Sequence, residues 1–305
     1  MISSHVFIST SLLILCALNG CASQGIELDP PGADEPEAVF TTFGGITLGD
    51  PLAVTIGFSD NVFVADGLPG RVVCWVEPSG ESLEFQKPTQ QPGFYPSDVK
   101  LSGFFVYALD PVERTLLRFD NRGAYRDILI RFDAVVPGQR ITPIGLDVDD
   151  SGRIAVTDVK NHQVILFDSY LSIELVFGSY GSSQGQFDAP EGITFTSDGN
   201  LLVTDSGNKR VQLFDSGGTY LRSIPTTQDN NPMAKPRRAV IDNKGNVFVA
   251  DPAAGRVFVF DEEGVFIRSI TPKGVSRFEP TDVEVTRSGR VYVTDAANSS
   301  LFVFR

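Results

Sequence analysis

One pattern occurs six times along this 305-residue chain, and it limits the possible folds more than any other feature. Each copy starts at a proline and reaches an aspartate 14 or 15 residues later, as from Pro51 to Asp66, and successive aspartates lie 44 to 48 residues apart. A regular period of this length marks a chain built from similar structural units. The leading prolines are Pro51, Pro96, Pro143, Pro190, Pro236 and Pro280, and the aspartates are Asp66, Asp110, Asp158, Asp205, Asp251 and Asp295.

The clearest copy, residues 189–215, shows what one unit contains. A strand-like run follows Pro190, and a turn at Gly199 leads into a second strand that ends at Asp205. A polar loop and a third apolar strand follow, and the alternating apolar residues give each strand one buried face. With about four strands per unit, a period in the mid-forties is typical of a β-propeller.

The detailed pattern resembles the NHL repeat: a leading proline, a glycine turn, an aliphatic strand ending in aspartate, a polar loop, an arginine and an apolar strand ending in Phe-Asp. The resemblance covers residues 38–305 and is weaker in the first two copies, since residues 111–114 follow Asp110 in place of a Gly- or Asn-containing loop. It implies an all-β fold, a six-bladed β-propeller of four-stranded antiparallel blades.

The two ends of this region are predicted to meet in one blade. The sixth copy reaches only its third strand, at residues 301–305, whereas residues 38–44 are similar to the fourth-strand segment 175–178 of the third copy. We therefore expect residues 38–43 to supply the strand that closes the last blade, so that only short blade edges stay exposed.

The N-terminus has the pattern of an export signal. Residues 6–18 are apolar but too few to span a bilayer, which suits the hydrophobic region of a signal peptide. Residues 18–21, Leu-Asn-Gly-Cys, resemble a bacterial lipobox, although residues 1–5 contain no Lys or Arg and Asn19 is unusual at its position. The alternative is ordinary signal-peptidase cleavage nearby, with the cysteine incidental.

The lipobox resemblance implies a protein anchored in the cell envelope. Residues 1–20 would be the signal peptide, Cys21 the lipidated N-terminus and residues 21–37 a flexible tether. Ala22 after the cysteine implies sorting to the outer membrane, on the periplasmic or the surface side, and several acyl chains together would anchor the chain firmly.

Charge and cysteine content exclude several classes of function. A formal net charge of −13 and a pI near 4.6 describe a surface that repels phosphate backbones, so nucleic acid is not an expected partner. Cys74, in the strand-like residues 72–76, is predicted to be a small core residue, and no second cysteine is left to pair with it. The chain has no Cys-x-x-Cys or His-Glu-x-x-His pattern, so we expect neither a metal nor a cofactor.

Two motif matches are interpreted as coincidences of the repeat. Residues 181–185 fit the G-x-S-x-G nucleophile pattern but lie between two copies, where no strand-to-helix elbow is expected. Residues 147–158 imitate part of a calcium loop, yet Asp158 is already accounted for as a repeat aspartate. The six repeat aspartates themselves are expected to accept hydrogen bonds from loop amides and to pair with arginines five residues downstream, such as Arg71, Arg210 and Arg256.

Functional variation is expected just after each leading proline, where the inner strands converge on the axis. Small residues stand two positions after the proline in three copies, whereas Asp98, Arg238 and Asp282 replace them in the other three. Glu191 and Arg237 are adjacent to this position in their own copies. The sequence predicts a polarised channel mouth, and the alternative is that these charges pair with one another across the channel.

A group of basic residues is the sharper candidate. Local positive charge on an acidic body attracts an anionic ligand or an acidic protein loop. We expect one face of adjacent blades to present Lys209, Arg210, Lys235, Arg237 and Arg238.

The functional prediction is a non-catalytic, monomeric binding or scaffold lipoprotein whose top face binds an envelope protein or an anionic ligand. The alternatives are a propeller lyase or hydrolase acting at the central channel, and a structural subunit that makes its contacts along the blade sides. The enzyme is disfavoured because the chain has no dense catalytic constellation and only His162 as a histidine beyond the signal peptide.

We expect Cys21→Ser to abolish anchoring, because no thiol would remain to accept the lipid. Incorporation of labelled fatty acid should stop, and the protein should leave the membrane fraction. Cys74→Ser is the control and should keep the label; unchanged labelling of Cys21→Ser would disprove the anchor.

Overall fold

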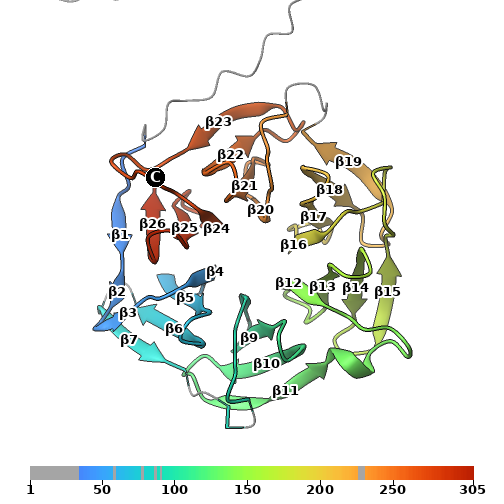
Figure 1. Cartoon of the computed structure of the whole chain (residues 1–305), viewed down its shortest axis with the longest axis horizontal. Coiled ribbons are helices and arrows are strands. Elements are labelled where there is room, and N and C mark those ends of the chain that lie inside the picture. The colour runs from blue at the N-terminus through green and yellow to red at the C-terminus, as the bar shows by residue number, and fades with distance from the viewer. Residues whose placement is uncertain (1–33, 58–59, 77–78, 86–87, 90, 226–230) are drawn as a thin grey trace, which may run out of the picture.

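The computed structural model describes residues 34–57, 60–76, 79–85, 88–89, 91–225 and 231–305. Its strands form six four-stranded antiparallel sheets that surround a central axis like blades (Figure 1). The predicted six-bladed β-propeller is therefore confirmed. The predicted signal peptide, Cys21 and residues 22–33 of the predicted tether lie outside the described residues.

Each blade runs from an inner strand at the axis to an outer strand at the rim. Blade 1 consists of β4 (Pro51–Ile56), β5 (Asn61–Asp66), β6 (Arg71–Val76) and β7 (Glu81–Glu84). Blade 2 consists of β8 (Asp98–Ser102), β9 (Phe105–Asp110), β10 (Thr115–Asp120) and β11 (Tyr125–Arg131). Blade 3 consists of β12 (Pro143–Val148), β13 (Ile154–Asp158), β14 (Gln163–Phe167) and β15 (Ile173–Phe177).

The second half of the ring repeats this arrangement. Blade 4 consists of β16 (Pro190–Phe195), β17 (Leu201–Asp205), β18 (Arg210–Phe214) and β19 (Tyr220–Ile224). Blade 5 consists of β20 (Arg238–Ile241), β21 (Val247–Asp251), β22 (Arg256–Phe260) and β23 (Phe266–Ile270). Blade 6 consists of β24 (Pro280–Val285), β25 (Val291–Asp295), β26 (Ser300–Phe304) and β1 (Ala38–Phe40). A short hairpin, β2 (Thr42–Phe43) with β3 (Ile46–Thr47), and one 3-10 turn, η2 (Phe132–Ala134), complete the elements.

Strand register explains why proline and aspartate keep their spacing. Pro51 lies opposite Asp66 in blade 1, and Pro190 lies opposite Asp205 in blade 4. The register shifts by one residue directly after each of these prolines, which places a bulge in the inner strand next to the axis. The two landmarks of the repeat are therefore the two ends of one inner hairpin.

The repeat aspartates hold loops in place, as predicted. Asp205 is fully buried, its Oδ1 accepts the N–H of Asp188 at 2.7 Å, and its Oδ2 accepts Nε of Arg210 at 2.8 Å. Asp66 pairs with Arg71 in the same way, at 2.9 Å between Oδ2 and Nη2. Asp110 has no such arginine and accepts backbone N–H groups, including that of Glu113 at 2.9 Å.

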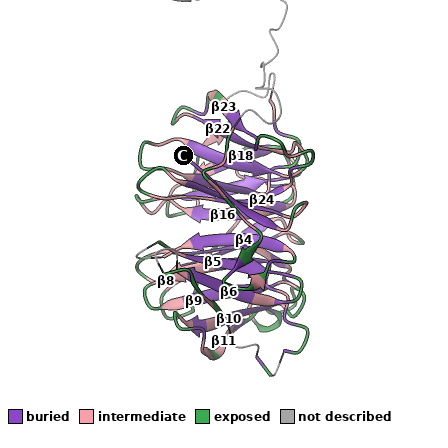
Figure 2. Cartoon of the chain, turned by 90° about the vertical axis from the view of Figure 1, so that its left-hand side faces the viewer, coloured by how far each residue is buried: buried purple, intermediate pink, exposed green. Residues whose placement is uncertain are grey.

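The core lies between blades rather than inside them. Each of the six apolar clusters joins two neighbouring blades, and the one that contains Val64 and Val303 joins the first blade to the last. Figure 2 shows burial along the strands and exposure in the loops at the two faces of the ring. Cys74 is buried in the cluster between blades 1 and 2, as predicted, and burial raises the pKa of its thiol to about 11. No described helix has the length and apolarity needed to cross a membrane.

The N-terminal strand closes the ring. β1 pairs antiparallel with β26, with Val39 opposite Phe302, so both ends of the propeller domain lie in blade 6. The pairing ends at Phe40 rather than continuing through Phe43, because Gly44 and Gly45, with φ of +50° and +93°, turn the chain back into the β2–β3 hairpin. This turn stacks Phe43 on Trp75 of blade 1 at 5.4 Å between ring centroids.

The last residues of the predicted tether contact blade 5. The backbone of Asp34 exchanges hydrogen bonds with Thr271 and Lys273, and its carboxylate pairs with Arg268 at 3.2 Å between Oδ1 and Nη1. Glu35 pairs with Lys273 at 2.9 Å. We call these five residues the N-terminal clasp.

We expect removal of the closing strand to destabilise the propeller more than removal of the residues before the clasp. A chain that begins at Gly45 loses β1 and the rings of Phe40 and Phe43, and loss of one buried phenylalanine ring alone costs about 3–5 kcal/mol. A chain that begins at Asp34 keeps all of these contacts. Thermal unfolding should separate the two by roughly 2–4 °C per kcal/mol, whereas equal melting temperatures would refute the closure.

Candidate functional site

The six positions two residues after the leading prolines surround one small cavity on the axis. Its volume is about 20 Å³, room for about one water molecule. Glycine is required where backbones converge: a Cβ at Gly145 would lie 2.1 Å from the carbonyl oxygen of Glu191. The six positions are Ala53, Asp98, Gly145, Gly192, Arg238 and Asp282.

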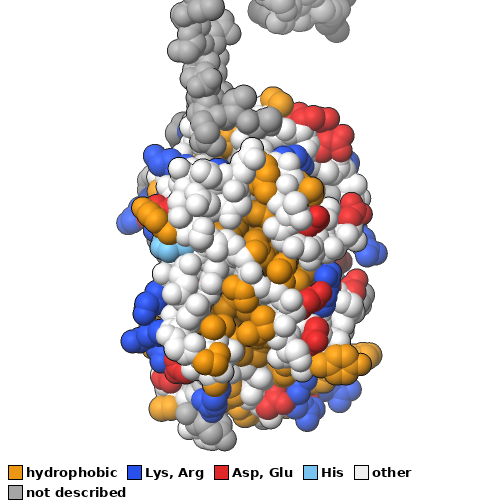
Figure 3. Space-filling model, turned by 90° about the vertical axis from the view of Figure 1, so that its right-hand side faces the viewer, with side chains coloured by type: hydrophobic (Ala, Val, Ile, Leu, Met, Phe, Trp, Pro, Cys, Tyr) orange, Lys and Arg blue, Asp and Glu red, His pale blue; other side chains and the backbone are white. Residues whose placement is uncertain are grey.

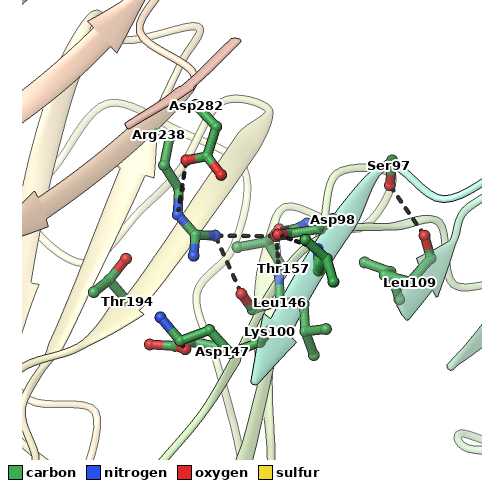
Figure 4. A network of polar contacts seen from close by, with 12 residues as sticks. Ser97, Asp98, Lys100, Leu109, Leu146, Asp147, Thr157, Thr194, Arg238 and Asp282 are labelled. Carbon is green, nitrogen blue, oxygen red and sulfur yellow. Dashed lines mark hydrogen bonds and ion pairs between the residues drawn. The ribbon is translucent and has the colours of Figure 1, made fainter. Parts of the chain in front are cut away.

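Arg238 bridges two carboxylates across the axis (Figure 4). Its Nη1 lies 3.0 Å from Oδ2 of Asp98, and its Nε lies 3.6 Å from Oδ1 of Asp282. Nη1 also donates to the carbonyl oxygen of Leu146 at 3.1 Å. All three charged side chains are buried, so the predicted polarised mouth is in fact a paired network that joins blades 2, 5 and 6.

A second tier of charges lies two residues further along the inner strands. Lys100 Nζ lies 3.3 Å from Oδ1 of Asp147 and 3.7 Å from Oε2 of Glu284. Each of these residues is four positions after its leading proline, on the same strand face as the first tier, because side chains alternate along a strand. We call the two tiers together the axial network; they occupy the channel with paired charges.

The axial network also links the backbones of neighbouring inner strands. Asp98 Oδ2 accepts the N–H of Leu146 at 2.7 Å, and Asp282 Oδ2 accepts the N–H of Val54 at 2.8 Å. Asp147 Oδ2 accepts the N–H of Phe195 at 2.7 Å in the same way. These aspartates therefore link the inner strands of neighbouring blades and also balance the buried positive charges.

Burial shifts protonation in the first tier. Loss of water raises the pKa of Asp282 to about 7 and also raises the pKa of Asp98, while Arg238 opposes both rises. Burial lowers the pKa of Arg238, but its carboxylate neighbours outweigh this effect and raise it overall. Burial therefore shifts both aspartates of this tier toward the protonated form, relative to an unfolded aspartate.

Above the network the channel opens into a depression of about 360 Å³ on the top face, the face where the inner strands begin. It shares Leu52, Ser97, Ile144, Glu191 and Arg237 with the axial cavity, so the two form one funnel that the network closes below. We call this depression the mouth pocket; its lining is Leu52, Tyr95, Ser97, Pro111, Ile144, Val159, Glu191 and Arg237.

Arg237 is the unpaired charge of the mouth pocket. Its side chain is half-buried, and no ion pair or side-chain hydrogen bond to it occurs within the described part of the chain. Glu191, in contrast, pairs with Lys235 at 3.5 Å. A guanidinium left free beside apolar walls is a ready partner for an anionic group.

The predicted basic face is smaller than the sequence suggests. Arg238 belongs to the axial network, and Arg210 is buried, where it pairs with Asp205 and donates to the carbonyl oxygens of Ser183 and Gln186. Lys209 and Lys235 are exposed on the top face. Both buried arginines satisfy their charge within the fold, so only Lys209, Lys235 and Arg237 are presented to a ligand.

The G-x-S-x-G match does not lie at a nucleophile elbow. Residues 181–185 lie in the loop between β15 and β16, with no strand-to-helix elbow. His162, the histidine of this region, accepts the N–H of Ala189 on its Nδ1 at 3.1 Å. Within the described residues, no group of three or more His, Cys, Asp or Glu side chains is arranged to hold a metal ion.

The side of the ring offers a different kind of surface. Figure 3 shows a band of apolar side chains on the side that carries β15 and β19. Its exposed members include Ile173 and Val176 on β15 and Leu221 on β19. This band is the feature that contacts along the blade sides would use.

Comparison with known proteins supports the repeat and the fold. Residues 142–167 and 187–214 match the model of the NHL repeat, so the chain contains NHL repeats, as the resemblance predicted. The fold is similar to that of a streptogramin B lyase, with a TM-score of 0.65 and 14% identity over 88% of this chain and 87% of that one. A search of curated proteins finds no match.

Two further solved structures show how widely this fold is used. A gluconolactonase from Xanthomonas campestris has a TM-score of 0.65 and 16% identity over 90% of this chain and 97% of that one. A chain of a nidogen/laminin complex has a TM-score of 0.61 and 15% identity over 74% of this chain and 82% of that one. Because enzymes and an interaction protein appear at equally low identity, these similarities describe the fold alone.

We expect Asp282→Asn to weaken the pH dependence of stability. A carboxyl group with a raised folded-state pKa stabilises the fold fully below its unfolded pKa of about 3.9, and this contribution is lost as the pH rises through about 7. From pH 5 to pH 8 the wild-type free energy of unfolding should fall relative to that of the variant, by up to about 1.4 kcal/mol per pH unit. Urea unfolding across this range measures the difference, and Asp150→Asn, an exposed carboxyl outside the network, should keep the wild-type slope.

Proposed function

Since the chain is a six-bladed β-propeller with NHL repeats, we propose that it is a non-catalytic binding protein whose ligand seat is the mouth pocket. The observation that carries this proposal is the unpaired guanidinium of Arg237 over a depression with apolar walls. Pockets of a few hundred Å³ with apolar walls and a few polar groups are the usual form of a ligand site. The axial network closes the channel below, so the mouth pocket is a binding site rather than a passage through the ring.

Electrostatics supports an anionic partner. The chain carries −13 overall, so an anion is attracted only where local positive charge is concentrated. Of the residues predicted to form the basic face, Lys209, Lys235 and Arg237 are the ones accessible on the top face. Binding should therefore weaken with added salt, because exposed charges are screened beyond about 8 Å at physiological ionic strength.

We also propose that the protein works at the cell envelope, anchored through lipid on Cys21. The lipobox-like residues 18–21 support this proposal. The N-terminal clasp holds the chain at the rim of blade 5, so an anchor there leaves the mouth pocket free to face a partner.

The second candidate is an enzyme that acts at the central channel. Asp282 favours it, because a carboxyl with a pKa near 7 beside a pocket is suited to general acid–base work. Against it, Oδ2 of Asp282 accepts the N–H of Val54 and Oδ1 accepts that of Val283, so its oxygens are engaged within the fold. A compound captured in the mouth pocket and recovered chemically changed, but unchanged by Asp282→Asn, would favour the enzyme.

We expect Arg237→Ser to lose the bound partner without loss of folding. The change removes one half-exposed, unpaired charge, so the melting temperature should move by only a few degrees. Wild-type protein immobilised at low salt should retain a component of an envelope extract that the variant does not, as measured by mass spectrometry of the eluates.

Lys244→Ser is the matched control, because it removes an exposed charge in the turn between β20 and β21, outside the mouth pocket, and should retain the component. Equal retention by wild-type protein and Arg237→Ser would place the binding surface elsewhere. Arg238 is left intact in this test, because its loss would leave Asp98 and Asp282 without their buried cation.

A further inference from the structure

The mouth pocket has one apolar side and one charged side. Its apolar wall comes from three different blades: Leu52 from blade 1, Pro111 from blade 2, and Ile144 and Val159 from blade 3. The ring of Tyr95 extends this wall. Arg237 lies on the opposite side, on the chain that leads into blade 5.

Nearly every polar group of the pocket is already engaged. Tyr95 donates its Oη to Oδ2 of Asp50 at 3.2 Å, and Ser97 donates its Oγ to the carbonyl oxygen of Leu109 at 3.4 Å. Glu191 is paired with Lys235. The pocket therefore fits a ligand that has one anionic group, placed at Arg237, and an apolar surface elsewhere.

The charge of Arg237 acts on Tyr95, which belongs to the apolar wall. Burial and the neighbouring Asp50 raise the pKa of Tyr95, and the positive charge of Arg237 opposes this rise. Tyr95 and Arg237 both line the mouth pocket, so an anion on Arg237 would share the pocket with the Tyr95 ring. Charge and apolar contact are available to one small molecule at the same time.

The charge of the surroundings selects among anions. Asp50, Glu191 and the carboxylates of the axial network lie around or below the pocket, so a dianion such as a phosphate monoester meets more repulsion than a singly charged carboxylate. The guanidinium fork binds carboxylate and phosphate alike, so the surrounding negative charge is what favours the carboxylate. A volume of about 360 Å³ is at the small end of ligand sites.

We propose that the mouth pocket recognises a monocarboxylate with a compact apolar body, its carboxylate on Arg237 and its body against Leu52, Ile144 and Val159. This inference rests on the proposed function and names the ligand class of the same site. The ligand chemistry has two possible sources, a free small acid and the C-terminal residue of a peptide.

The test uses the whole propeller chain and three probes, N-acetyl-leucine, its neutral isostere N-acetyl-leucinamide and inorganic phosphate, with binding followed by calorimetry or ligand-observed NMR. We expect N-acetyl-leucine to bind at least tenfold more tightly than the amide or phosphate. Arg237→Gln should abolish this preference, and Ile144→Ser should weaken binding of the acid several-fold while keeping the preference over the amide. Lys244→Gln, matched in charge change and located in the turn between β20 and β21 outside the mouth pocket, should bind as wild type does.

A second arm separates the two sources. Binding of a tetrapeptide that ends in leucine with a free carboxylate, but not of its amidated form, would assign the site to peptide C-termini. Binding of N-acetyl-leucine alone would assign it to free acids; both outcomes support the proposal.

Equal binding of acid and amide, tighter binding of phosphate, or an unchanged preference in Arg237→Gln would overturn it. The proposed function is judged separately, by the extract experiment. If Arg237→Ser loses the retained component while none of the probes binds, the site stands and only the ligand class is wrong.

Discussion

The pairing of β1 with β26 is the interaction on which the rest of the structure depends. Each of the six apolar clusters among the described residues lies between two blades, so each blade buries its apolar side chains against both of its neighbours. Without the N-terminal strand, the last blade would lack its outer strand, and Trp75 of the first blade would lose the ring of Phe40. A ring of mutually dependent interfaces is therefore completed by three residues from the other end of the domain.

The axial network shows how a buried charge cluster can serve structure rather than chemistry. Buried charges are costly unless their partners and hydrogen bonds are complete. Here carboxylates of blades 2 and 6 share Arg238 and also accept backbone N–H groups. The arrangement fixes the relative position of blades that share no sheet. It also closes the channel, so that the top face has a pocket with a floor.

Sequence analysis predicted the fold and the six axial positions because both depend on a strict period, and the spacing from proline to aspartate sets the register of each inner hairpin. It left the pairing of Arg238 with charges across the channel only as the alternative to a polarised mouth, since periodicity gives the level of a residue along its strand but not the reach of its side chain across the axis. The second tier could have been predicted, because Asp98 and Lys100 are two residues apart and therefore lie on the same face of the strand. The apolar wall and the clasp had none, because Val159 lies in a loop and Asp34 lies in a polar segment whose partners are more than 200 residues away.

Under the proposed anchoring, the N-terminal segment also carries mechanical load. Tension from a membrane would travel along the chain and reach the propeller first at Asp34, where backbone hydrogen bonds and the ion pair with Arg268 fasten it to blade 5. Only after these contacts gave way would the pull act on β1, whose release opens the ring. In an anchored protein the clasp would therefore bear the pulling force first and protect the pairing of β1 with β26, which closes the ring.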